Sequence, residues 1–441
     1  MRRFSQAMVC GLGASGVAAA RLLRAEGAAV FAVDERDTPD SRKAAAALAA
    51  DGCAVALGAG APPAGAYDVA VASPGLPAAG PLLSELRRRG IPLVSELELG
   101  WSRFRGRAIA VTGSNGKSSV VKALAECLEA AGRRAVPCGN YGLPVCQAVA
   151  DASDAEWLVI EASSFQLETC AEFRPDIGVL MNVLPNHLDR HGTLEGYARI
   201  KARMFARQRA GDLALVPPEW RERFQAWAGG GGRWATFGAQ AGQDFFHAPR
   251  RLAARGGAAI DIAGSYFDNE VLGPNAAALF GAALAAGAPA ETIAAVLRAF
   301  RPLPHRAEPV GEVAGVRYVN DSKATNLSAL VASLRMQDRP VWLIAGGRPK
   351  ETDFSAARPA LRERVRGVFL IGEAAAAMAA AWSGTVPCEI CGTLERAVAA
   401  ARRAARPGEA VLLAPACTSY DQFRAYPERG EAFRKFALEK D

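Results

Sequence analysis

The segment that most constrains the fold of this 441-residue chain is a glycine-rich loop that joins an apolar run to a helical pattern. The run 108–111 has the character of a buried strand, and apolar residues recur at helical spacing over 120–128. Between them, 112–118 reads Thr-Gly-Ser-Asn-Gly-Lys-Ser. Backbone N–H groups of such a loop point at phosphate oxygens, the lysine adds positive charge, and a serine hydroxyl can bind Mg²⁺. We therefore expect a nucleoside triphosphate site rather than an ordinary glycine turn, although Val111 replaces the first glycine of the general P-loop pattern.

Length and charge narrow the class of protein. A chain of this length is expected to hold two or three domains, and its apolar content of 50% with 22% charged residues is ordinary for a globular protein. The formal net charge of +7 suits nucleic acid, a membrane surface or an acidic small molecule. The arginines are scattered, so a substrate rich in phosphate or carboxylate explains the charge more simply, and we expect no nucleic-acid partner.

The compartment is expected to be the cytoplasm. The N-terminus lacks the apolar core of a signal peptide, and no run of about 18 uncharged apolar residues predicts membrane insertion. Nine cysteines, an odd number spread over the chain, are typical of reduced thiols. Cys388 and Cys391 form a lone C-x-x-C pair, for which burial is the simpler interpretation than a redox or zinc role.

Residues 1–95 are expected to form a Rossmann-like α/β unit. The pattern G-x-G-x-x-G at 11–16 follows a strand-like run, and a second strand, 29–33, ends in Asp34. A Rossmann unit places its ribose-binding acid there, so NAD is one possible ligand. Ser-Pro-Gly at 73–75 forms a rigid turn after another strand. Because the carboxyl ends of parallel strands meet at one edge, these loops suit a nucleotide-like ligand.

The second unit, 96–301, contains the phosphate loop and a strand, 157–160, that ends in Glu161. A carboxylate at a strand end beside a phosphate loop is where an Mg²⁺ ligand is expected, because the metal bridges the nucleotide to the protein. The alternative is a solvent-facing glutamate. The segment 210–270 has the pattern of short strands and turns, and two helical patterns follow it.

Two of the four histidines, His187 and His191, stand four residues apart. Zinc binding on a helix would suit this spacing, but the interior acid of H-E-x-x-H is absent and Gly192 ends any helix. One histidine that helps to hold Mg²⁺ or substrate is the better interpretation. In the helical stretch 194–206, Lys201 lies among arginines, a pattern typical of a solvated basic face.

The third unit, 302–441, begins after a proline-rich connector and again alternates strands with helices. Each expected strand runs into a polar loop rich in glycine or hydroxyls, and these strands are 316–319, 341–345, 368–371 and 410–414. The expected fold class is therefore α/β with three domains, Rossmann-like at both ends and of the P-loop ATPase type in the centre.

Taken together, these motifs make the chain resemble the Mur ligase family over nearly its whole length. Its most similar members are those that add D-glutamate. The motifs that carry the resemblance are Gly-Leu-Gly-Ala-Ser-Gly at 11–16, Ser-Pro-Gly at 73–75, Thr-Gly-Ser-Asn-Gly-Lys-Ser at 112–118, Glu-Ala-Ser-Ser-Phe-Gln-Leu-Glu at 161–168, Asn-His-Leu-Asp at 186–189, Leu-Pro-His-Arg at 303–306, Asn-Asp-Ser-Lys-Ala-Thr-Asn at 320–326 and Ser-Tyr-Asp-Gln-Phe at 419–423. The family's loop also lacks the first glycine, so Val111 agrees with it.

The resemblance implies an ADP-forming amide ligase of cytoplasmic peptidoglycan precursor synthesis. In this family ATP phosphorylates a carboxylate, an amino-acid amine attacks the acyl phosphate, and phosphate leaves. The implied partners are UDP-N-acetylmuramoyl-L-alanine, D-glutamate and ATP, with two Mg²⁺ ions and a carbamylated Lys201. A monomer is expected.

The resemblance also assigns roles at matching positions. The implied catalytic residues are Lys117, His187, Lys201 and Lys323, and the implied metal ligands are Ser118, Glu161, His187 and Lys201. ATP is implied to contact Gly113, Ser114, Asn115, Gly116, Lys117, Ser118, Ser119, Asn275, Arg306 and Asp321. The UDP-sugar is implied to contact Ala14, Ser15, Arg36, Ser73, Pro74, Gly75, Asn140 and Gln166, which replaces NAD as the ligand of the first unit. Glutamate is implied to contact Thr325, Lys350, Ser419 and Tyr426, and the third domain is implied to close on ATP.

Departures from the family pattern keep alternatives open. Asn186 stands where many relatives have aspartate, Glu351 follows Gly-Gly-Arg-Pro-Lys where a glycine is usual, and Tyr426 stands where phenylalanine is common. The last two changes lie near the implied glutamate pocket, so a ligase that adds L-glutamate or another amino acid is the nearest alternative. A P-loop switch or scaffold, and an NAD-linked dehydrogenase, are alternatives of other classes.

Overall fold

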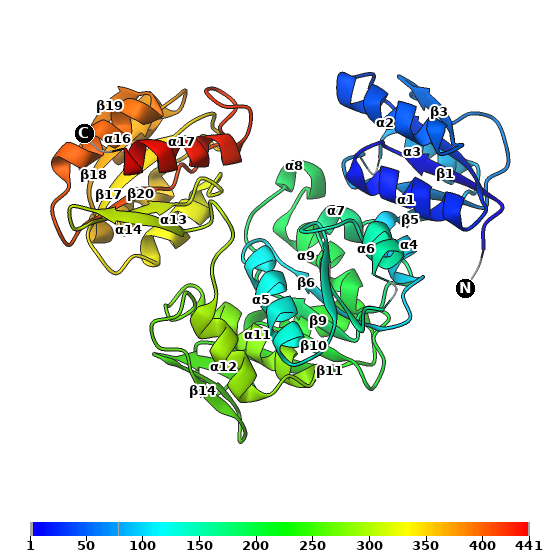
Figure 1. Cartoon of the computed structure of the whole chain (residues 1–441), viewed down its shortest axis with the longest axis horizontal. Coiled ribbons are helices and arrows are strands. Elements are labelled where there is room, and N and C mark those ends of the chain that lie inside the picture. The colour runs from blue at the N-terminus through cyan, green and yellow to red at the C-terminus, as the bar shows by residue number, and fades with distance from the viewer. Residues whose placement is uncertain (1–2, 78, 153, 440–441) are drawn as a thin grey trace. The chain divides into compact units, whose positions relative to one another are not determined.

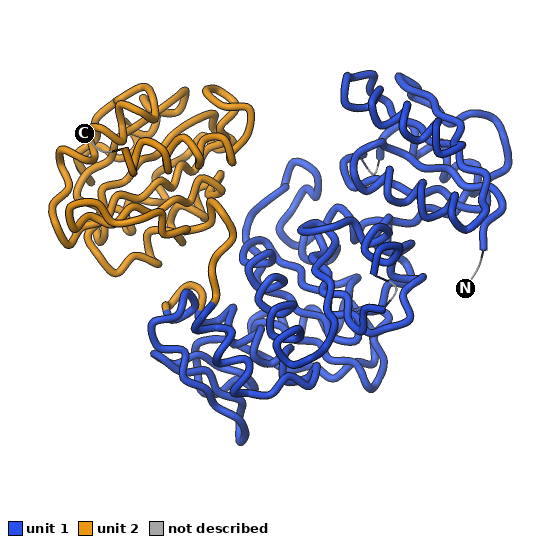
Figure 2. Tube along the Cα trace, viewed as in Figure 1, with its two compact units in different colours: residues 1–268, 273–299 blue, residues 269–272, 300–441 orange. Residues whose placement is uncertain are grey.

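The computed structural model describes residues 3–77, 79–152 and 154–439 (Figure 1). The chain divides into two compact units (Figure 2). The first compact unit, residues 1–268 with 273–299, covers nearly all of the first two α/β units expected from the sequence, and the second compact unit, residues 269–272 with 300–441, covers the third. Within the described residues, three mostly parallel sheets of five, nine and six strands carry the helices. The mixed α/β architecture expected from the sequence is confirmed.

The first sheet has the order β3-β2-β1-β4-β5, and all its pairs are parallel. The strand order reverses at β1, so the loops after β1 and β4 flank the switch point where doubly wound sheets bind ligands. Its strands are β1 (Gln6–Cys10), β2 (Ala29–Asp34), β3 (Ala54–Leu57), β4 (Val69–Ala72) and β5 (Leu93–Ser95). Its helices are α1 (Ala14–Ala25), α2 (Pro39–Ala50) and α3 (Pro81–Arg88), and α4 (Glu96–Trp101) leads to the next sheet.

The second sheet has the order β14-β13-β12-β11-β10-β9-β6-β8-β7, parallel from β7 to β12 and antiparallel beyond. Because β6 lies between β8 and β9, the loops after these three strands are neighbours. The strands are β6 (Arg107–Thr112), β7 (Ala135–Gly139), β8 (Trp157–Glu161), β9 (Ile177–Leu180), β10 (Leu213–Val216), β11 (Arg233–Gly238), β12 (Phe245–Ala248), β13 (Arg251–Ala254) and β14 (Ala259–Asp261). The helices are α5 (Lys117–Ala130), α6 (Val145–Asp151), α7 (Ser164–Leu167), α8 (Leu188–His191), α9 (Leu194–Ala202), η1 (Arg203–Phe205), α10 (Pro218–Ala228), α11 (Gly273–Ala285) and α12 (Ala290–Ala299).

Helix α10 differs from the expectation of only short strands and turns over 210–270. Trp220, Phe224 and Trp227 recur at helical spacing, and Phe224 is fully buried between the other two rings and Phe205. Pro218 occupies the first turn, where proline favours a helix rather than ending it. Aromatic burial therefore forms a helix in a segment whose prolines and glycines resemble a loop.

The third sheet, in the second unit, has the order β15-β16-β20-β17-β18-β19, with only the β15–β16 pair antiparallel. Strand β20 lies between β16 and β17, so the loops after these three strands meet at one edge. The strands are β15 (Glu308–Val313), β16 (Val316–Asn320), β17 (Val341–Gly346), β18 (Val365–Ile371), β19 (Cys388–Gly392) and β20 (Ala410–Leu413). The helices are α13 (Leu327–Arg335), η2 (Ser355–Ala357), α14 (Arg358–Arg364), α15 (Ala375–Trp382), α16 (Leu394–Ala404) and α17 (Tyr426–Leu438).

The cysteines are unbonded, and most of them are buried. All nine cysteines are free thiols, eight of them buried, and burial raises the pKa of Cys127 to about 12. The thiols are therefore packing groups, and Cys388 and Cys391 are not bonded to each other. Within the described ranges, no helix combines the length and apolarity needed to cross a bilayer.

Candidate active site

The phosphate loop lies between β6 and α5, and two of its glycines have backbone angles that other residues rarely adopt. Gly113 has φ 147°, and a Cβ there would lie 2.8 Å from the Met181 Cβ. Gly116 has φ 86°, and a Cβ there would lie 2.7 Å from the Asn275 amide nitrogen. Both positions need glycine for conformation and for space. The second contact also places Asn275, one of the expected ATP residues, directly against the loop.

Asn182, which the sequence did not single out, organises this loop. Its Oδ1 accepts hydrogen bonds from the backbone N–H groups of Ser114 and Asn115 at 3.1 and 2.9 Å. Its Nδ2 donates to the Asn115 carbonyl at 3.2 Å. Asn182 follows β9, the neighbour of β6, so a polar residue at an adjacent strand end was the signal that could have found it.

Lys117 is the first residue of α5, and its ammonium lies within the curve of the loop. Nζ donates to the carbonyls of Gly113 and Ser114 at 2.9 and 3.0 Å. A cation held this close to the loop and to the N-terminal end of a helix of 14 residues provides favourable electrostatics for a phosphate.

Glu161 ends β8 and is buried, with 3% of its surface exposed. Its Oε2 accepts a hydrogen bond from the Ser118 hydroxyl at 2.6 Å, and its Oε1 accepts one from the Asn140 amide at 2.6 Å. A carboxylate oxygen beside a serine hydroxyl next to a phosphate loop is a donor set that Mg²⁺ accepts, because it prefers hard oxygen ligands together with nucleotide oxygens. These residues fit the expected metal. The structure places Asn140 against Glu161, although Asn140 was expected to contact the UDP-sugar.

Lys201 is buried, with 1% of its surface exposed, so the interpretation of this residue as part of a solvated face is wrong. Nζ donates to the Gly113 carbonyl at 3.1 Å and lies 4.2 Å from the centre of the Tyr197 ring. Burial, and then the nearby Lys117 charge, lower the pKa of Lys201 well below its usual value. The amine therefore lies beside the phosphate loop, where burial and the Lys117 charge both disfavour its charged form.

Both histidines contact the Phe165 ring, but they have different partners. His187 is the residue before α8, has φ 54°, and packs edge-on against Phe165 with ring centroids 4.8 Å apart. His191 Nε2 lies 3.0 Å from the Ser164 hydroxyl. Gln166, expected to contact the UDP-sugar, is buried, and its Oε1 accepts a hydrogen bond from the Ser163 N–H in the cap of α7.

A hydrogen bond joins the loops after β1 and β4. Gly16, in the first turn of α1, lies so close to the first loop that a Cβ would lie 1.8 Å from the Gly11 carbonyl oxygen. The Ser73 hydroxyl donates to that same carbonyl at 2.9 Å. Ala14 and Ser15 open α1 beside these loops. The expected UDP-sugar residues 14, 15 and 73–75 therefore share one edge of the first sheet.

Asp34 has a structural role at this edge. Its carboxylate accepts hydrogen bonds from the backbone N–H groups of Leu12 and Arg36 at 2.8 and 2.9 Å and is almost fully buried. The position that suggested an NAD ribose acid thus holds two loops together. The Arg36 side chain is exposed at the same edge.

In the second unit, the expected residues gather where β16, β17 and β20 end. Lys323 Nζ lies 4.2 Å from the centre of the Tyr426 ring, and the Ser322 hydroxyl donates to the Tyr426 carbonyl at 2.8 Å. Burial raises the pKa of the Asp321 carboxyl to about 6. Ser419 is buried, whereas Lys350 is exposed. Thr325 follows Lys323 in the same loop, and Arg306 precedes β15.

Arg429, on α17, was not anticipated and connects two of these loops. It is 1% exposed and donates to the Ser322 hydroxyl and to the carbonyls of Cys417 and Thr418 at 3.0, 3.0 and 3.2 Å. Burial lowers its pKa to about 10. A buried guanidinium satisfied by carbonyls fixes the separation of the loops that carry Lys323 and Ser419. One arginine in a helix gives no sequence signal for this role.

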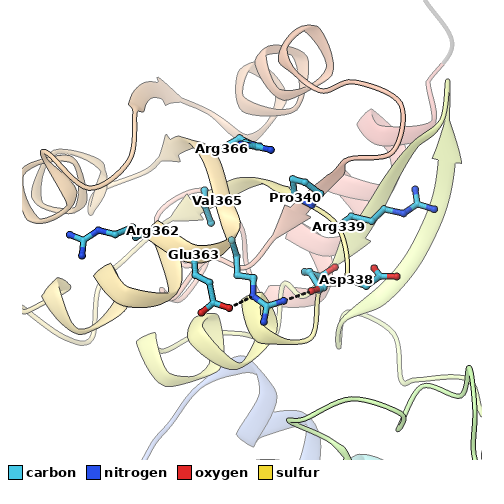
Figure 3. A pocket seen from close by; sticks show the side chains of 9 residues that line it. Asp338, Arg339, Pro340, Arg362, Glu363, Val365 and Arg366 are labelled. Carbon is cyan, nitrogen blue, oxygen red and sulfur yellow. Dashed lines mark hydrogen bonds and ion pairs between the residues drawn. The ribbon is translucent and has the colours of Figure 1, made fainter. Parts of the chain in front are cut away.

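A separate cavity of about 490 Å³ lies before β17 and β18, at the opposite strand ends (Figure 3). Arg364 donates to Glu363 at 2.9 Å and to the Gln337 carbonyl at 3.0 Å, and Arg339 and Arg362 point away from each other. These arginines do not converge on one point, so this cavity is not part of the candidate site.

The fold and the site define the class as a P-loop nucleotide-binding α/β protein with a buried carboxylate and a buried lysine beside the loop. Three family models match the chain: the Mur ligase MurD-like N-terminal domain over 5–95, the Mur ligase middle domain over 111–272, and the Mur ligase glutamate ligase domain over 305–417. The chain belongs to the Mur ligase family, as its motifs predicted. Members of this family are ATP-dependent, ADP-forming amide ligases.

Individual relatives are similar over almost their whole length. The chain is 39% identical to the UDP-N-acetylmuramoylalanine–D-glutamate ligase of Acidobacterium capsulatum, with 98% of this chain and 95% of that protein covered. It is 41% identical to the ligase of the same name from Nitratidesulfovibrio vulgaris, with 97% and 95% covered. Among solved structures, MurF ligase from Thermotoga maritima in complex with ADP matches with a TM-score of 0.63 at 16% identity, covering 93% of this chain and 94% of that one. MurC from the same organism matches with a TM-score of 0.60 at 15% identity, covering 98% of each chain. These two structures support the fold.

Proposed function

We propose that the protein uses ATP to join D-glutamate to the alanine carboxyl of UDP-N-acetylmuramoyl-L-alanine, a cytoplasmic step of peptidoglycan precursor synthesis. The observation that carries this proposal is the full-length similarity to ligases of that name, at 36–41% identity, in a chain whose phosphate loop lies beside a buried carboxylate and lysine.

The proposed reaction has two steps, formation of an acyl phosphate and attack on it by an amine. An oxygen of the alanine carboxylate attacks the γ-phosphorus of ATP, ADP leaves, and an acyl phosphate forms. The neutral amine of glutamate then attacks the acyl carbon, the amide forms after a proton leaves nitrogen, and phosphate departs with the carboxyl oxygen. Lys117 and the loop N–H groups offset negative charge that develops on the phosphoryl oxygens in the first step.

Two cation sites are proposed beside the loop. Ser118 and Glu161 would hold one Mg²⁺ ion, and His187 with a carbamylated Lys201 would hold the other; bound Mg²⁺ supplies charge neutralisation to the phosphoryl group. The carbamate forms when the neutral Lys201 amine attacks CO₂ and a proton leaves, which turns a cation into a carboxylate-like ligand. The lowered pKa of Lys201 supports this proposal, because only the neutral amine is a nucleophile.

The remaining roles follow the motif positions. The turn 73–75 with Ala14, Ser15 and Arg36 would bind the UDP-sugar, with Asn140 and Gln166 nearer the reacting end. In the second unit, Arg306, Asp321 and Lys323 would contact the nucleotide once that unit closes on ATP. Glutamate would be bound by Thr325, Lys350, Ser419 and Tyr426, where an ammonium and hydroxyls can pair two carboxylates.

The test of this function is phosphate release by the purified protein with ATP, Mg²⁺ and UDP-N-acetylmuramoyl-L-alanine. We expect release with D-glutamate and almost none with L-glutamate or without an amino acid. A preference for L-glutamate would retain the ligase class and place the error in the pocket around Lys350 and Tyr426. Release that depends on no amino acid would contradict the ligase and favour a nucleotide switch.

A further inference from the structure

Arg190, in the single helical turn α8, contacts both domains of the first unit. Its guanidinium forms two hydrogen bonds to the Glu168 carboxylate, at 2.9 and 2.6 Å, and lies 4.1 Å from the centre of the Phe165 ring. The same guanidinium donates to the carbonyls of Pro74 and Leu76 at 3.2 and 2.8 Å. These carbonyls belong to the strand-end turn of the first sheet, more than 100 residues away along the chain. One side chain therefore connects the turn after β4 to the elements beside the phosphate loop.

The side chains around Arg190 hold the same helical turn. His191 lies 3.0 Å from the Ser164 hydroxyl and 3.5 Å from the Glu168 carboxylate. His187, at the start of α8, packs on Phe165 and has a left-handed φ of 54°. Non-glycine residues keep such a conformation only where the surroundings hold it. The position of His187 thus depends on the contacts that hold α8 in place, which are those of Arg190 and His191.

We propose that Arg190 is a positioning residue that couples ligand binding at the turn 73–76 to the position of His187. A UDP-sugar bound at that turn would order the two carbonyls that Arg190 contacts. Arg190 would then hold α8, and with it His187, in the arrangement that binds the Mg²⁺–nucleotide. This inference rests on the proposed function, because it takes the UDP-sugar as the ligand of the turn.

Coupling between the two binding sites must be reciprocal. If the UDP-sugar raises the affinity for the Mg²⁺–nucleotide by some factor, the Mg²⁺–nucleotide must raise the affinity for the UDP-sugar by the same factor. Arginine suits the role because its planar fork bonds the carboxylate and the carbonyls at once, which a lysine ammonium cannot do with the same geometry.

The experiment measures the dissociation constant of UDP-N-acetylmuramoyl-L-alanine by calorimetry, with and without Mg²⁺ and a non-hydrolysable ATP analogue. In the wild type we expect the analogue to tighten binding by about tenfold. In Arg190→Met, which keeps contact with Phe165 but loses every hydrogen bond, we expect that factor to fall to about one. In Arg190→Lys, the factor should lie between the values of the wild type and of Arg190→Met.

The matched control is Arg88→Met, since Arg88 also forms two hydrogen bonds to a glutamate, Glu85, but lies exposed on α3. In this control, the ATP analogue should tighten UDP-sugar binding by the same factor as in the wild type. If the ATP analogue still tightened UDP-sugar binding about tenfold in Arg190→Met, the proposed coupling would be overturned. It would also be overturned if Arg190→Met lost the same affinity for each ligand measured alone as it loses for the two together, because that result indicates a purely structural role. A wild type that binds no UDP-sugar would instead overturn the proposed function, and the inference with it.

Discussion

Replacement of Lys201 by alanine is expected to lower the rate of amide formation by about 100-fold or more. The side chain lies 3.1 Å from the Gly113 carbonyl of the phosphate loop and is almost fully buried, so its loss removes a group at the site itself. Because the proposed ligand is a carbamate, formate or acetate should enter the space left by the side chain and restore part of the rate. The measurement is phosphate release against the concentration of the added acid.

The control for this prediction is Lys122→Ala on helix α5. Lys122 pairs with Glu126 one turn along the same helix, where the two side chains are partly exposed, so its removal should change the rate less than twofold and respond to no added acid. Full activity in Lys201→Ala would show that Lys201 has no role in the reaction. A large loss without any rescue, in a variant that still binds ATP, would argue against the carbamate and leave the lysine a purely cationic role.

The second large effect is expected for Glu161→Gln. The glutamine amide can donate to the Ser118 hydroxyl while its oxygen accepts from Asn140, so both hydrogen bonds of Glu161 have a neutral replacement. The fold should survive, whereas an oxygen ligand for Mg²⁺ loses its charge. We expect the rate to fall by about 100-fold and the Mg²⁺ concentration for half-maximal rate to rise about tenfold or more.

The matched change is Glu126→Gln, which removes a surface carboxylate on α5 and should leave the Mg²⁺ dependence unchanged. The prediction is checked by initial rates over a range of Mg²⁺ concentrations, together with thermal unfolding of each variant. An unaltered Mg²⁺ dependence in folded Glu161→Gln would show that this carboxylate is not a metal ligand.

Much of the arrangement of the candidate site in the first unit could be predicted because its signals are local. The glycines, Lys117 and Ser118 lie within one loop, and Glu161 follows an apolar strand directly. The solvated face predicted for Lys201 from its arginine neighbours was wrong, although a signal for burial existed: with Leu194, Tyr197 and Ala198 it lies at i, i+3, i+4 and i+7, the spacing of one buried helix face. The neighbouring arginines suggested solvent, but the inward face determines the environment of Lys201.

Other site residues depend on contacts between distant segments. Asn182 accepts a hydrogen bond from a loop residue 67 positions earlier in the sequence. Arg429 is hydrogen-bonded to Ser322, 107 positions away, and Arg190 to Leu76, 114 positions away. No periodicity or motif in one sequence indicates which polar side chain will meet which loop. Such residues become visible only when the sheet order brings the strand ends together.

The most direct test of the central claim is to follow the carboxyl oxygen. UDP-N-acetylmuramoyl-L-alanine with ¹⁸O in both carboxyl oxygens would be incubated with ATP, Mg²⁺, D-glutamate and the protein, and the released phosphate analysed by mass. An acyl phosphate must break its carbon–oxygen bond when the amine attacks, so each phosphate should carry one ¹⁸O atom. Amide formation with unlabelled phosphate would contradict the acyl-phosphate route.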